Sequence, residues 1–347
     1  MLTKRQKAIL EFVQANEQVT AAELIKGLAG KFDRLSKPTI LRELEILLSI
    51  GQIEKRGKAR SVTYSSKIKT PLLRYVNAAD YFAVPVDERK IKYRFDWEIF
   101  DHLSGLFNKE ELKDLEKRNK AYQQKTDKMA VDVAQKELER LLIELSWKSS
   151  ELEGNTYSLL DTEVLLKEMK EAKGHTKAEA TMILNHKYAL DFVLKNKNKF
   201  KKPTAALIRA LHSLLIKDLG VTDDYRKIVV GIVGTNYKPI DNQFQIKEAM
   251  EKMISAVNTE EQPIIKAIIA AAMISYIQPF VDGNKRTGRI LGNAILLAHD
   301  WCPLSFRSVD SAEYKKALLL FYEQNSLRYF KELFVQQFEF AVKNYFG

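Results

Sequence analysis

The chain has 347 residues, of which 46% are apolar and 29% charged, and its formal net charge of +11 favours anionic partners such as nucleic acids or nucleotides. No stretch offers eighteen clean apolar residues, which argues against a transmembrane helix, and the basic, amphipathic segment 1–12 lacks the apolar core of a signal peptide. The single cysteine, Cys302, excludes an internal disulfide and fits the reducing environment of the cytoplasm, where we expect the protein to work without a membrane partner.

The first 66 residues predict a small unit of three helices followed by a hairpin. Apolar periodicity predicts helices at 3–16, 21–28 and 36–50, and alternating apolar residues predict strands at 52–55 and 59–65. Thr20 and Glu23 form a capping box before the second helix, and Ser36 can cap the third.

This order of elements resembles a winged helix-turn-helix domain, in which the third helix enters the major groove of DNA and the wing contacts the backbone. The resemblance implies DNA contacts from the third helix and the wing, at Lys37, Thr39, Arg42, Lys55, Arg56 and Lys58. Residues 1–66 hold twelve lysine and arginine residues against seven acidic residues, a modest excess for a DNA-binding unit. We favour DNA binding, and the alternative is a protein–protein module with ordinary surface charges.

Residues 67–110 predict a connecting segment, because Pro71 and Pro85 interrupt regular structure. Helical periodicity dominates the rest of the chain, with helices predicted at 109–125, 131–145, 161–170, 177–195, 203–217, 245–257, 262–277, 284–299, 311–323 and 327–345. The one strand-like stretch there, 227–233 with 236–239, predicts a hairpin. The fold class is therefore mainly α.

The run Ile-Gln-Pro-Phe-Val-Asp-Gly-Asn-Lys-Arg-Thr-Gly-Arg at 277–289 is the most informative part of the chain. A turn that opens a helix presents unpaired backbone N–H groups, and these bind anions. Arg286 and Arg289 are three residues apart and share a helix face, while Asp282 can hold a divalent cation against phosphate oxygens. The run therefore suits the phosphate groups of a nucleotide together with a metal ion.

The same run resembles the signature of the Fic (Fic/Doc) family, H-P-F-x-[DE]-G-N-[GK]-R-x-x-R, except that Gln278 stands where the family has its catalytic histidine. The resemblance implies an all-α core with a small β-hairpin flap. It also implies transfer of AMP from ATP to a serine, threonine or tyrosine hydroxyl of a target protein or of the protein itself. In that case Asp282 would hold Mg²⁺, and the phosphates of ATP would be bound by Gly283, Asn284, Lys285, Arg286 and Arg289.

A second stretch, 149–154, resembles the inhibitory motif of the family, [ST]-x-x-x-E-[GN], through Ser149, Glu153 and Gly154. The resemblance implies that Glu153 pairs with Arg289 and displaces the outer phosphate of ATP, because a carboxylate can occupy the place of a phosphate. Residues Gly234, Thr235, Asn236 and Tyr237, which follow a Tyr-Arg pair, resemble the flap that adds a strand to a target peptide. On this resemblance the Fic domain spans residues 111–347.

Gln278 bears directly on whether the protein is an enzyme. A glutamine amide cannot accept a proton near neutral pH, and loss of a general base costs about 10²–10⁴ in rate. None of the five histidines is a clear replacement. His212 lies in an apolar segment and suits a hydrogen bond in the core, and His299 lies fifteen residues along the helix from Asn284.

Two functions are therefore compatible with the sequence. The first is a Fic-type protein adenylyltransferase that is weak or inactive and is inhibited by Glu153. The second is a non-catalytic, nucleotide-sensing transcription regulator, in which ATP binding alters DNA binding. A kinase that holds the nucleotide in the inverted sense is a minor third option, suggested by Lys285, and it too would need the histidine. The oligomeric state stays open, a homodimer included.

Overall fold

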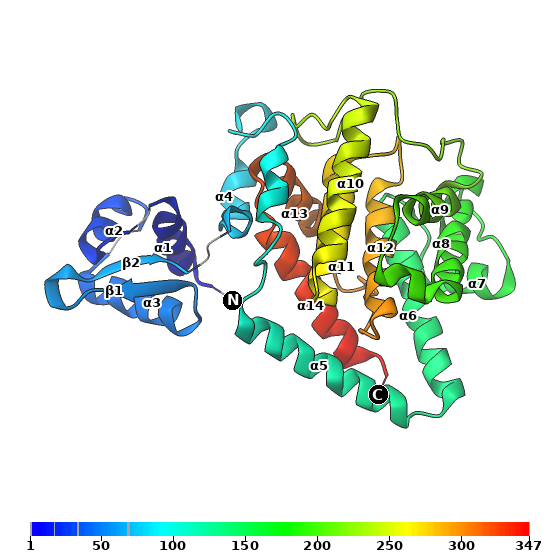
Figure 1. Ribbon diagram of the computed structural model, residues 1–347, viewed down its shortest axis with the longest axis horizontal. Helices are drawn as coiled ribbons and strands as arrows, with labels where there is room; N and C mark the ends of the chain where they lie inside the picture. Colours follow the sequence, from blue (N-terminus) through cyan, green and yellow to red (C-terminus); the bar gives the residue numbers. More distant parts are fainter. Residues whose placement is uncertain (1, 17, 33–34, 68–69, 347) are drawn as a thin grey trace.

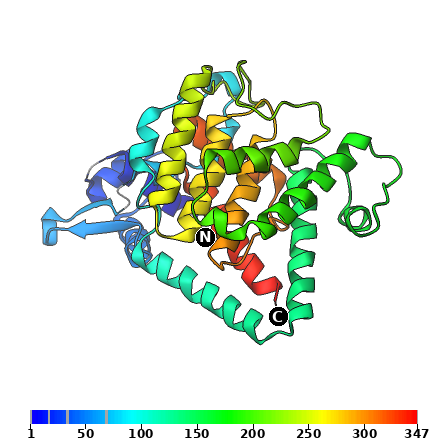
Figure 2. The ribbon, with the colours of Figure 1, turned by 45° about the vertical axis from the view of Figure 1, so that its right-hand side comes forward.

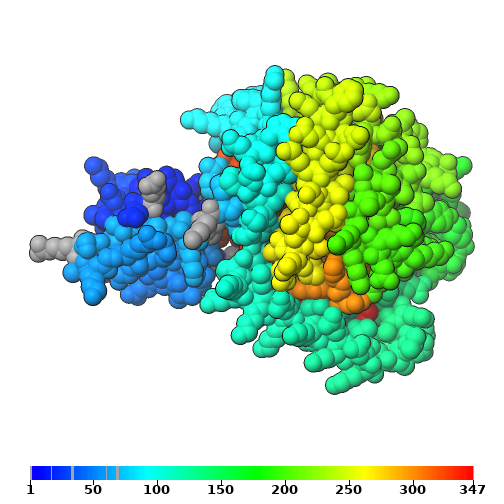
Figure 3. Space-filling model, viewed as in Figure 1, coloured from blue at the N-terminus to red at the C-terminus, as the bar shows by residue number. Residues whose placement is uncertain are grey.

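The computed structural model describes residues 2–16, 18–32, 35–67 and 70–346. Figures 1 and 3 show a small N-terminal unit attached to a much larger helical body. The chain is mainly helical, as predicted, and the one sheet in the described ranges has two strands. Among the helices of those ranges, none combines the length and the apolar character that crossing a membrane requires.

The N-terminal unit contains the three helices and two strands predicted for residues 1–66, except that the first residues of the second predicted strand, 59–61, form a 3₁₀ turn. They are α1 (Lys4–Ala15), α2 (Ala21–Gly27), α3 (Lys37–Ser49), β1 (Ile53–Arg56), the 3₁₀ turn η1 (Ala59–Ser61) and β2 (Thr63–Ser66). The capping box of Thr20 and Glu23 forms, and Ser36 caps α3. Apolar side chains from the three helices and both strands build a hydrophobic core separate from that of the body, as expected of an independent unit. Its assignment as a winged helix-turn-helix domain stays a prediction.

The connecting segment consists of short turns that lie against the body. It includes η2 (Pro71–Leu73), α4 (Ala78–Ala83), η3 (Val86–Glu88) and η4 (Trp97–His102). The backbone N–H of Leu327 donates to the carbonyl of Leu72 at 2.7 Å. Arg89 forms a salt bridge with the buried Glu323 at 3.4 Å, and the hydroxyl of Tyr81 donates to the same carboxylate at 2.6 Å. These contacts fasten the connecting segment to the last two helices of the chain.

The body is a bundle of helices whose positions agree closely with the predicted ones. They are α5 (Lys109–Lys128), α6 (Val131–Glu151), α7 (Leu159–Glu168), α8 (Lys177–Lys195), η5 (Lys197–Lys201), α9 (Ala205–Ile216), α10 (Gln243–Thr259), α11 (Pro263–Ile277), α12 (Asn284–Ala298), α13 (Ser311–Gln324) and α14 (Arg328–Asn344). Figure 2 shows α5 and α6 as two long arms that meet at an angle, with the end of α14 between them.

Helix α11 is the centre of the body. Every residue from Ile264 to Ile277 is buried, because the helix is apolar on all sides, and α10 and α12 both pack against it. Helix α12 approaches α11 closely because two of its residues are glycines. A Cβ atom at Gly288 would lie 2.7 Å from the carbonyl oxygen of Ala271, and one at Gly292 would lie 3.2 Å from that of Ala267. This packing holds the start of α12 firmly in place.

The hairpin predicted at 227–233 and 236–239 does not form. Residues 217–242 contain no strand, and the isolated bridge there joins Lys238 to Arg94 of the connecting segment. The buried guanidinium of Arg226 donates to the carbonyl oxygens of Ile228, at 2.8 Å, and Ile240. These two carbonyl groups are therefore hydrogen-bonded by a side chain, and the predicted flap is a loop held to the body.

Candidate functional site

The predicted phosphate-binding loop connects the C-terminal end of α11 to the N-terminal start of α12. Gln278 ends α11 in the left-handed conformation, with φ of 51°, and Gly283 begins α12 with φ of 79°. The first backbone hydrogen bond of α12 runs from Thr287 to the carbonyl of Gly283 at 2.8 Å. The N–H groups of the preceding three residues, 284–286, therefore have no acceptor within the helix. An unpaired helix N-terminus of this kind attracts anions.

The side chain of Asn284 closes this loop. Its Oδ1 accepts from the N–H of Phe280 at 2.9 Å, and its Nδ2 donates to the carbonyl of Phe280 at 2.8 Å and to Oε1 of Gln278 at 2.9 Å. We expected this amide to contribute to the anion site. In the structure the side-chain amide of Asn284 forms its hydrogen bonds within the loop. Only the backbone N–H of Asn284 is therefore available to an anion.

Two arginines lie buried beneath the loop, each with 1% of its surface exposed. Arg286 pairs with Asp282 through Nη2 and Oδ2 at 2.7 Å and donates from Nη1 to the carbonyl of Leu215 at 3.2 Å. Arg289 donates from Nε to the hydroxyl of Ser149 at 2.9 Å and from Nη2 to the carbonyl of Ser149 at 2.8 Å. Two buried guanidinium groups on one helix face destabilise the fold unless negative charges pair with them.

Glu153 supplies a negative charge to Arg289 and to the neighbouring Lys285. Its Oε1 lies 2.8 Å from Nη2 of Arg289, and its Oε2 lies 2.7 Å from Nζ of Lys285. The chain leaves α6 just before this residue and turns at Gly154, whose φ is 96°, so the carboxylate faces the start of α12. Burial alone would raise the pKa of Glu153, but Arg289 and Lys285 outweigh it and lower the pKa to about 2. The predicted pairing of Glu153 with Arg289 is therefore formed, by a fully ionised carboxylate.

Gln278 has no free group with which to accept a proton. Its Nε2 donates to the carbonyl of Ser275 at 2.6 Å, and its Oε1 accepts from Asn284. His212 does not replace it, because the ring is stacked on Phe280 with centroids 3.6 Å apart and donates from Nε2 to the carbonyl of Asp282 at 2.9 Å. His212 thus supports the loop from within the core, in the role predicted for it.

The carboxylate of Asp282 is the one group of the loop that suits a metal ion. Its side chain is 62% exposed, and the hydrogen bond to Arg286 uses Oδ2. No set of three histidine, cysteine, aspartate or glutamate side chains in the described residues could hold a metal ion by itself. A single carboxylate fits Mg²⁺, which proteins commonly bind through one or two carboxylates completed by water and phosphate oxygens.

The predicted flap residues fasten their segment to the body. The carbonyl of Gly234 accepts from Arg89 at 3.2 Å, and Asn236 donates to Asp87 at 2.9 Å. Tyr237 is buried and donates from its hydroxyl to the carbonyl of Tyr276 at 3.1 Å, while the hydroxyl of Thr235 accepts from the N–H of Tyr237. The apolar side chains exposed on this segment lie earlier, at Ile228, Val229 and Val233.

The residues predicted to contact DNA lie on the N-terminal unit, away from this loop (Figure 1). The cations of this set are all exposed, namely Lys37, Arg42, Lys55, Arg56 and Lys58. Thr39 is half-buried, and its hydroxyl shares a hydrogen bond of 2.8 Å with that of Ser36. The structure therefore presents two separate sets of cations, one buried around the loop and one on the surface of the N-terminal unit.

Two residues that hold the site were not predicted in that role. Arg226 donates from Nε to the carbonyl of Gln278 at 2.6 Å, and its backbone N–H donates to the carbonyl of Pro279 at 3.0 Å. His186 on α8 contacts the hydroxyl of Ser149 through Nε2 at 2.8 Å. Both lie far from their partners in the sequence, and nothing in the local pattern distinguishes them from ordinary core residues.

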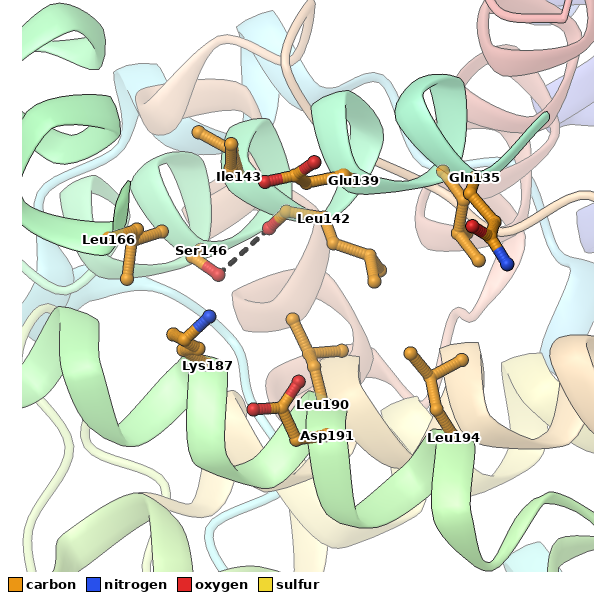
Figure 4. A pocket seen from close by; sticks show the side chains of 11 residues that line it. Gln135, Glu139, Leu142, Ile143, Ser146, Leu166, Lys187, Leu190, Asp191 and Leu194 are labelled. Carbon is orange, nitrogen blue, oxygen red and sulfur yellow. Dashed lines mark hydrogen bonds between the residues drawn. The ribbon is translucent and has the colours of Figure 1, made fainter. Parts of the chain in front are cut away.

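A pocket of about 280 Å³ lies apart from this loop, between α6 and α8 (Figure 4). Leucines on both helices line it, among them Leu138, Leu142 and Leu190. Its lining includes neither the loop 278–289 nor Glu153. The loop and the apolar pocket are therefore separate parts of the molecule.

Residues 202–296 match the model of the Fic/DOC family, so this part of the chain is a Fic/DOC domain. The protein adenylyltransferase Fic of Nematostella vectensis is 27% identical over 188 residues, which cover 50% of this chain and 41% of that protein. A probable protein adenylyltransferase of Aquifex aeolicus is 31% identical over 105 residues, which cover 30% of this chain and 32% of that protein. The chain thus spans less than half the length of these two relatives.

The fold is also similar to that of solved structures. The structure of Fic-1 (residues 134–508) from C. elegans aligns with a TM-score of 0.57 at 20% identity, covering 67% of this chain and 69% of that one. This likeness shows that the helical arrangement of the body is that of Fic proteins.

Proposed function

We propose that this chain, whose residues 202–296 form a Fic/DOC domain, binds ATP at the loop 278–289 and is a protein adenylyltransferase held inactive by Glu153 and weakened by Gln278. The observation that carries the proposal is the buried contact of Glu153 with Arg289 and Lys285. A carboxylate that neutralises two cations at a helix N-terminus occupies the place of an anionic ligand. The names of the relatives, which are protein adenylyltransferases, supply the type of reaction.

ATP binding would use groups that now face Glu153 or solvent. The N–H groups at the start of α12 would donate to phosphate oxygens, and Arg289 and Lys285 would exchange the carboxylate of Glu153 for a phosphate. Asp282 would hold Mg²⁺ together with the phosphates, and the metal ion would neutralise their negative charge. Arg286, already paired with Asp282, would keep that carboxylate in place.

The transfer step needs a proton acceptor, which Gln278 does not supply. When a target hydroxyl attacks the α-phosphorus, its oxygen gains a bond to phosphorus, the bond to the pyrophosphate group breaks, and the hydroxyl proton must leave. Gln278 cannot take that proton, and both ends of its amide are already hydrogen-bonded. Orientation and phosphate binding are independent of this acceptor, so residual transfer about 10²–10⁴ below that of a histidine variant is expected.

The second candidate is a nucleotide-sensing regulator that binds DNA and catalyses nothing. The Gln278 amide, which is not basic and is hydrogen-bonded at both its nitrogen and its oxygen, favours this function. An N-terminal unit that has its own core and exposed cations on α3 and around β1 favours it as well. In this account ATP would displace Glu153 and thereby change the affinity for DNA.

Transfer of label from α-labelled ATP with Mg²⁺ tests the proposal. We compare the natural chain, Gln278→His, Glu153→Gly and the double variant, with Gln278→Ala as the control for loss of the amide alone. Label transfer should be greatest in the double variant and at least a hundredfold lower in Glu153→Gly alone. If the double variant binds ATP and transfers no label to itself or to a lysate, the adenylyltransferase function is wrong and the regulator is favoured.

A further inference from the structure

The hydroxyl of Ser149 lies between two buried side chains from other helices. Nε of Arg289 on α12 is 2.9 Å from its oxygen, and Nε2 of His186 on α8 is 2.8 Å from the same oxygen. All three residues are at most 1% exposed. The contact therefore joins α6, α8 and α12 at one point beside Glu153.

The direction of these hydrogen bonds follows from the chemistry of each group. Nδ1 of His186 lies 2.8 Å from the carbonyl oxygen of Met182, which can only accept, so Nδ1 carries the proton. Burial, together with Arg286 and Arg289, lowers the pKa of His186 to about 3, so the ring is neutral and Nε2 is an acceptor. Ser149 must then donate its hydroxyl proton to His186, which leaves its oxygen lone pairs for the N–H of Arg289.

The neighbouring serines show that this arrangement is not the default for α6. A serine inside a helix commonly donates to the carbonyl four residues earlier. Ser146 donates to Leu142 and Ser150 donates to Ser146 in this way, both at 2.8 Å. Ser149 lies between them, is equally buried, and donates across the interface to His186.

We propose that His186 is a positioning residue for the inhibited state: by accepting the Ser149 proton it fixes the serine oxygen as an acceptor and so holds the Arg289 guanidinium against Glu153. The proposal rests on the proposed function, in which Glu153 keeps a phosphate away from Arg289. The hydrogen bonds of the His186 ring go to α6 and to its own helix, so it acts on Arg289 through Ser149. Loss of the acceptor should make the Arg289 side chain more mobile and weaken its salt bridge with Glu153.

Three variants of the full chain separate this role from general packing. His186→Leu removes the acceptor with similar volume, His186→Gln keeps an amide oxygen able to accept, and His102→Leu is the control at a half-buried histidine on η4. The first measurement is the exchange rate of the Arg289 Nε–H by NMR, assigned by its loss in Arg289→Lys. We expect exchange at least tenfold faster in His186→Leu, and a rate near that of the natural chain in His186→Gln and His102→Leu.

The second measurement is the dissociation constant of ATP with Mg²⁺. His186→Leu should bind ATP about threefold to tenfold more tightly than the natural chain, and it should change nothing further in a Glu153→Gln background. Should His186→Leu fail to fold, Ser149→Ala breaks the same chain of hydrogen bonds at the hydroxyl. Unchanged Arg289 exchange in a folded variant overturns the positioning role. If no variant binds ATP, Glu153→Gln included, the proposed function is wrong. In that case the exchange rate of the Arg289 Nε–H still decides whether His186 positions Arg289.

Discussion

At the scale of one residue, Arg289 carries a buried positive charge that is paired with Glu153. Its guanidinium reaches the carbonyl and the hydroxyl of Ser149 and one oxygen of Glu153, and it lies 5.4 Å from the centre of the Tyr314 ring. An unpaired buried charge costs several kcal/mol. Glu153 can therefore leave Arg289 only if another anion takes its place, which is the condition for a plug that yields to a phosphate.

Two buried histidines predict how the stability of the protein depends on pH. Burial, assisted by Arg286, lowers the pKa of His212 from 6.5 to about 4, and burial lowers that of His186 to about 3. Between pH 6.5 and 4 the unfolded chain binds more protons than the folded protein. The free energy of unfolding should therefore be largest above pH 6.5 and fall as the pH decreases through this window.

Urea unfolding at half-unit steps of pH measures this slope. In His212→Gln the slope between pH 6 and 4.5 should decrease by up to about 1.4 kcal/mol per pH unit, the contribution of one proton. Equal slopes in the natural chain and His212→Gln would mean that His212 is not held neutral by the fold.

At the scale of elements, the contact between α11 and α12 places the loop. The carbonyl of Ala271 leaves no room for a side chain at Gly288, whereas Gly292 has slightly more space opposite Ala267. Gly288→Ala should lower the free energy of unfolding by about 1–3 kcal/mol, because α12 must move away from α11. Gly292→Ala is the matched control with a smaller expected loss. Thermal unfolding of both variants checks the order, and equal stability of the two would contradict this account of the packing.

The elements also show what a sequence can and cannot reveal. Helix α8 begins and ends as predicted, because Thr176 and Glu179 form a capping box before a periodic apolar stripe. The loop 278–289 could be found because its residues are contiguous. The prediction of a hairpin at 227–239 was wrong: the run of β-branched residues there favours a strand, but the guanidinium of Arg226 binds the carbonyl groups of Ile228 and Ile240. The contact of His186 with Ser149 joins residues 37 positions apart and leaves no local signal.

At the scale of the whole molecule, the connecting segment joins the N-terminal unit to the body. Tyr75 packs in the core of the N-terminal unit, and its ring lies 5.1 Å from the guanidinium of Arg328 on α14. Further along, Lys238 donates its N–H to the carbonyl of Tyr93 at 2.8 Å. The connecting segment therefore contacts both the N-terminal unit and the loop 234–238.

DNA binding by the N-terminal unit can be tested by gel shift with a 30-base-pair duplex of random sequence. The affinity of the full chain should fall steeply with salt. Replacing Lys55, Arg56 and Lys58 by alanine should reduce the slope of log affinity against log salt by about 0.9 for each DNA phosphate that the variant no longer neutralises. Replacing Lys136, Lys170 and Lys173, exposed lysines of the body, is the matched control. No complex at low salt would favour the protein–protein alternative for this unit.

The affinity for ATP with Mg²⁺, measured by calorimetry, tests most directly whether Glu153 occupies a phosphate site. Glu153→Gln should bind at least tenfold more tightly than the natural chain, a gain of about 1.4 kcal/mol, and adding Arg289→Ala should abolish that gain. Glu151→Gln, two residues earlier at the end of α6, should bind like the natural chain. Equal affinities for the natural chain and Glu153→Gln, or tight binding that survives Arg289→Ala, would contradict the account.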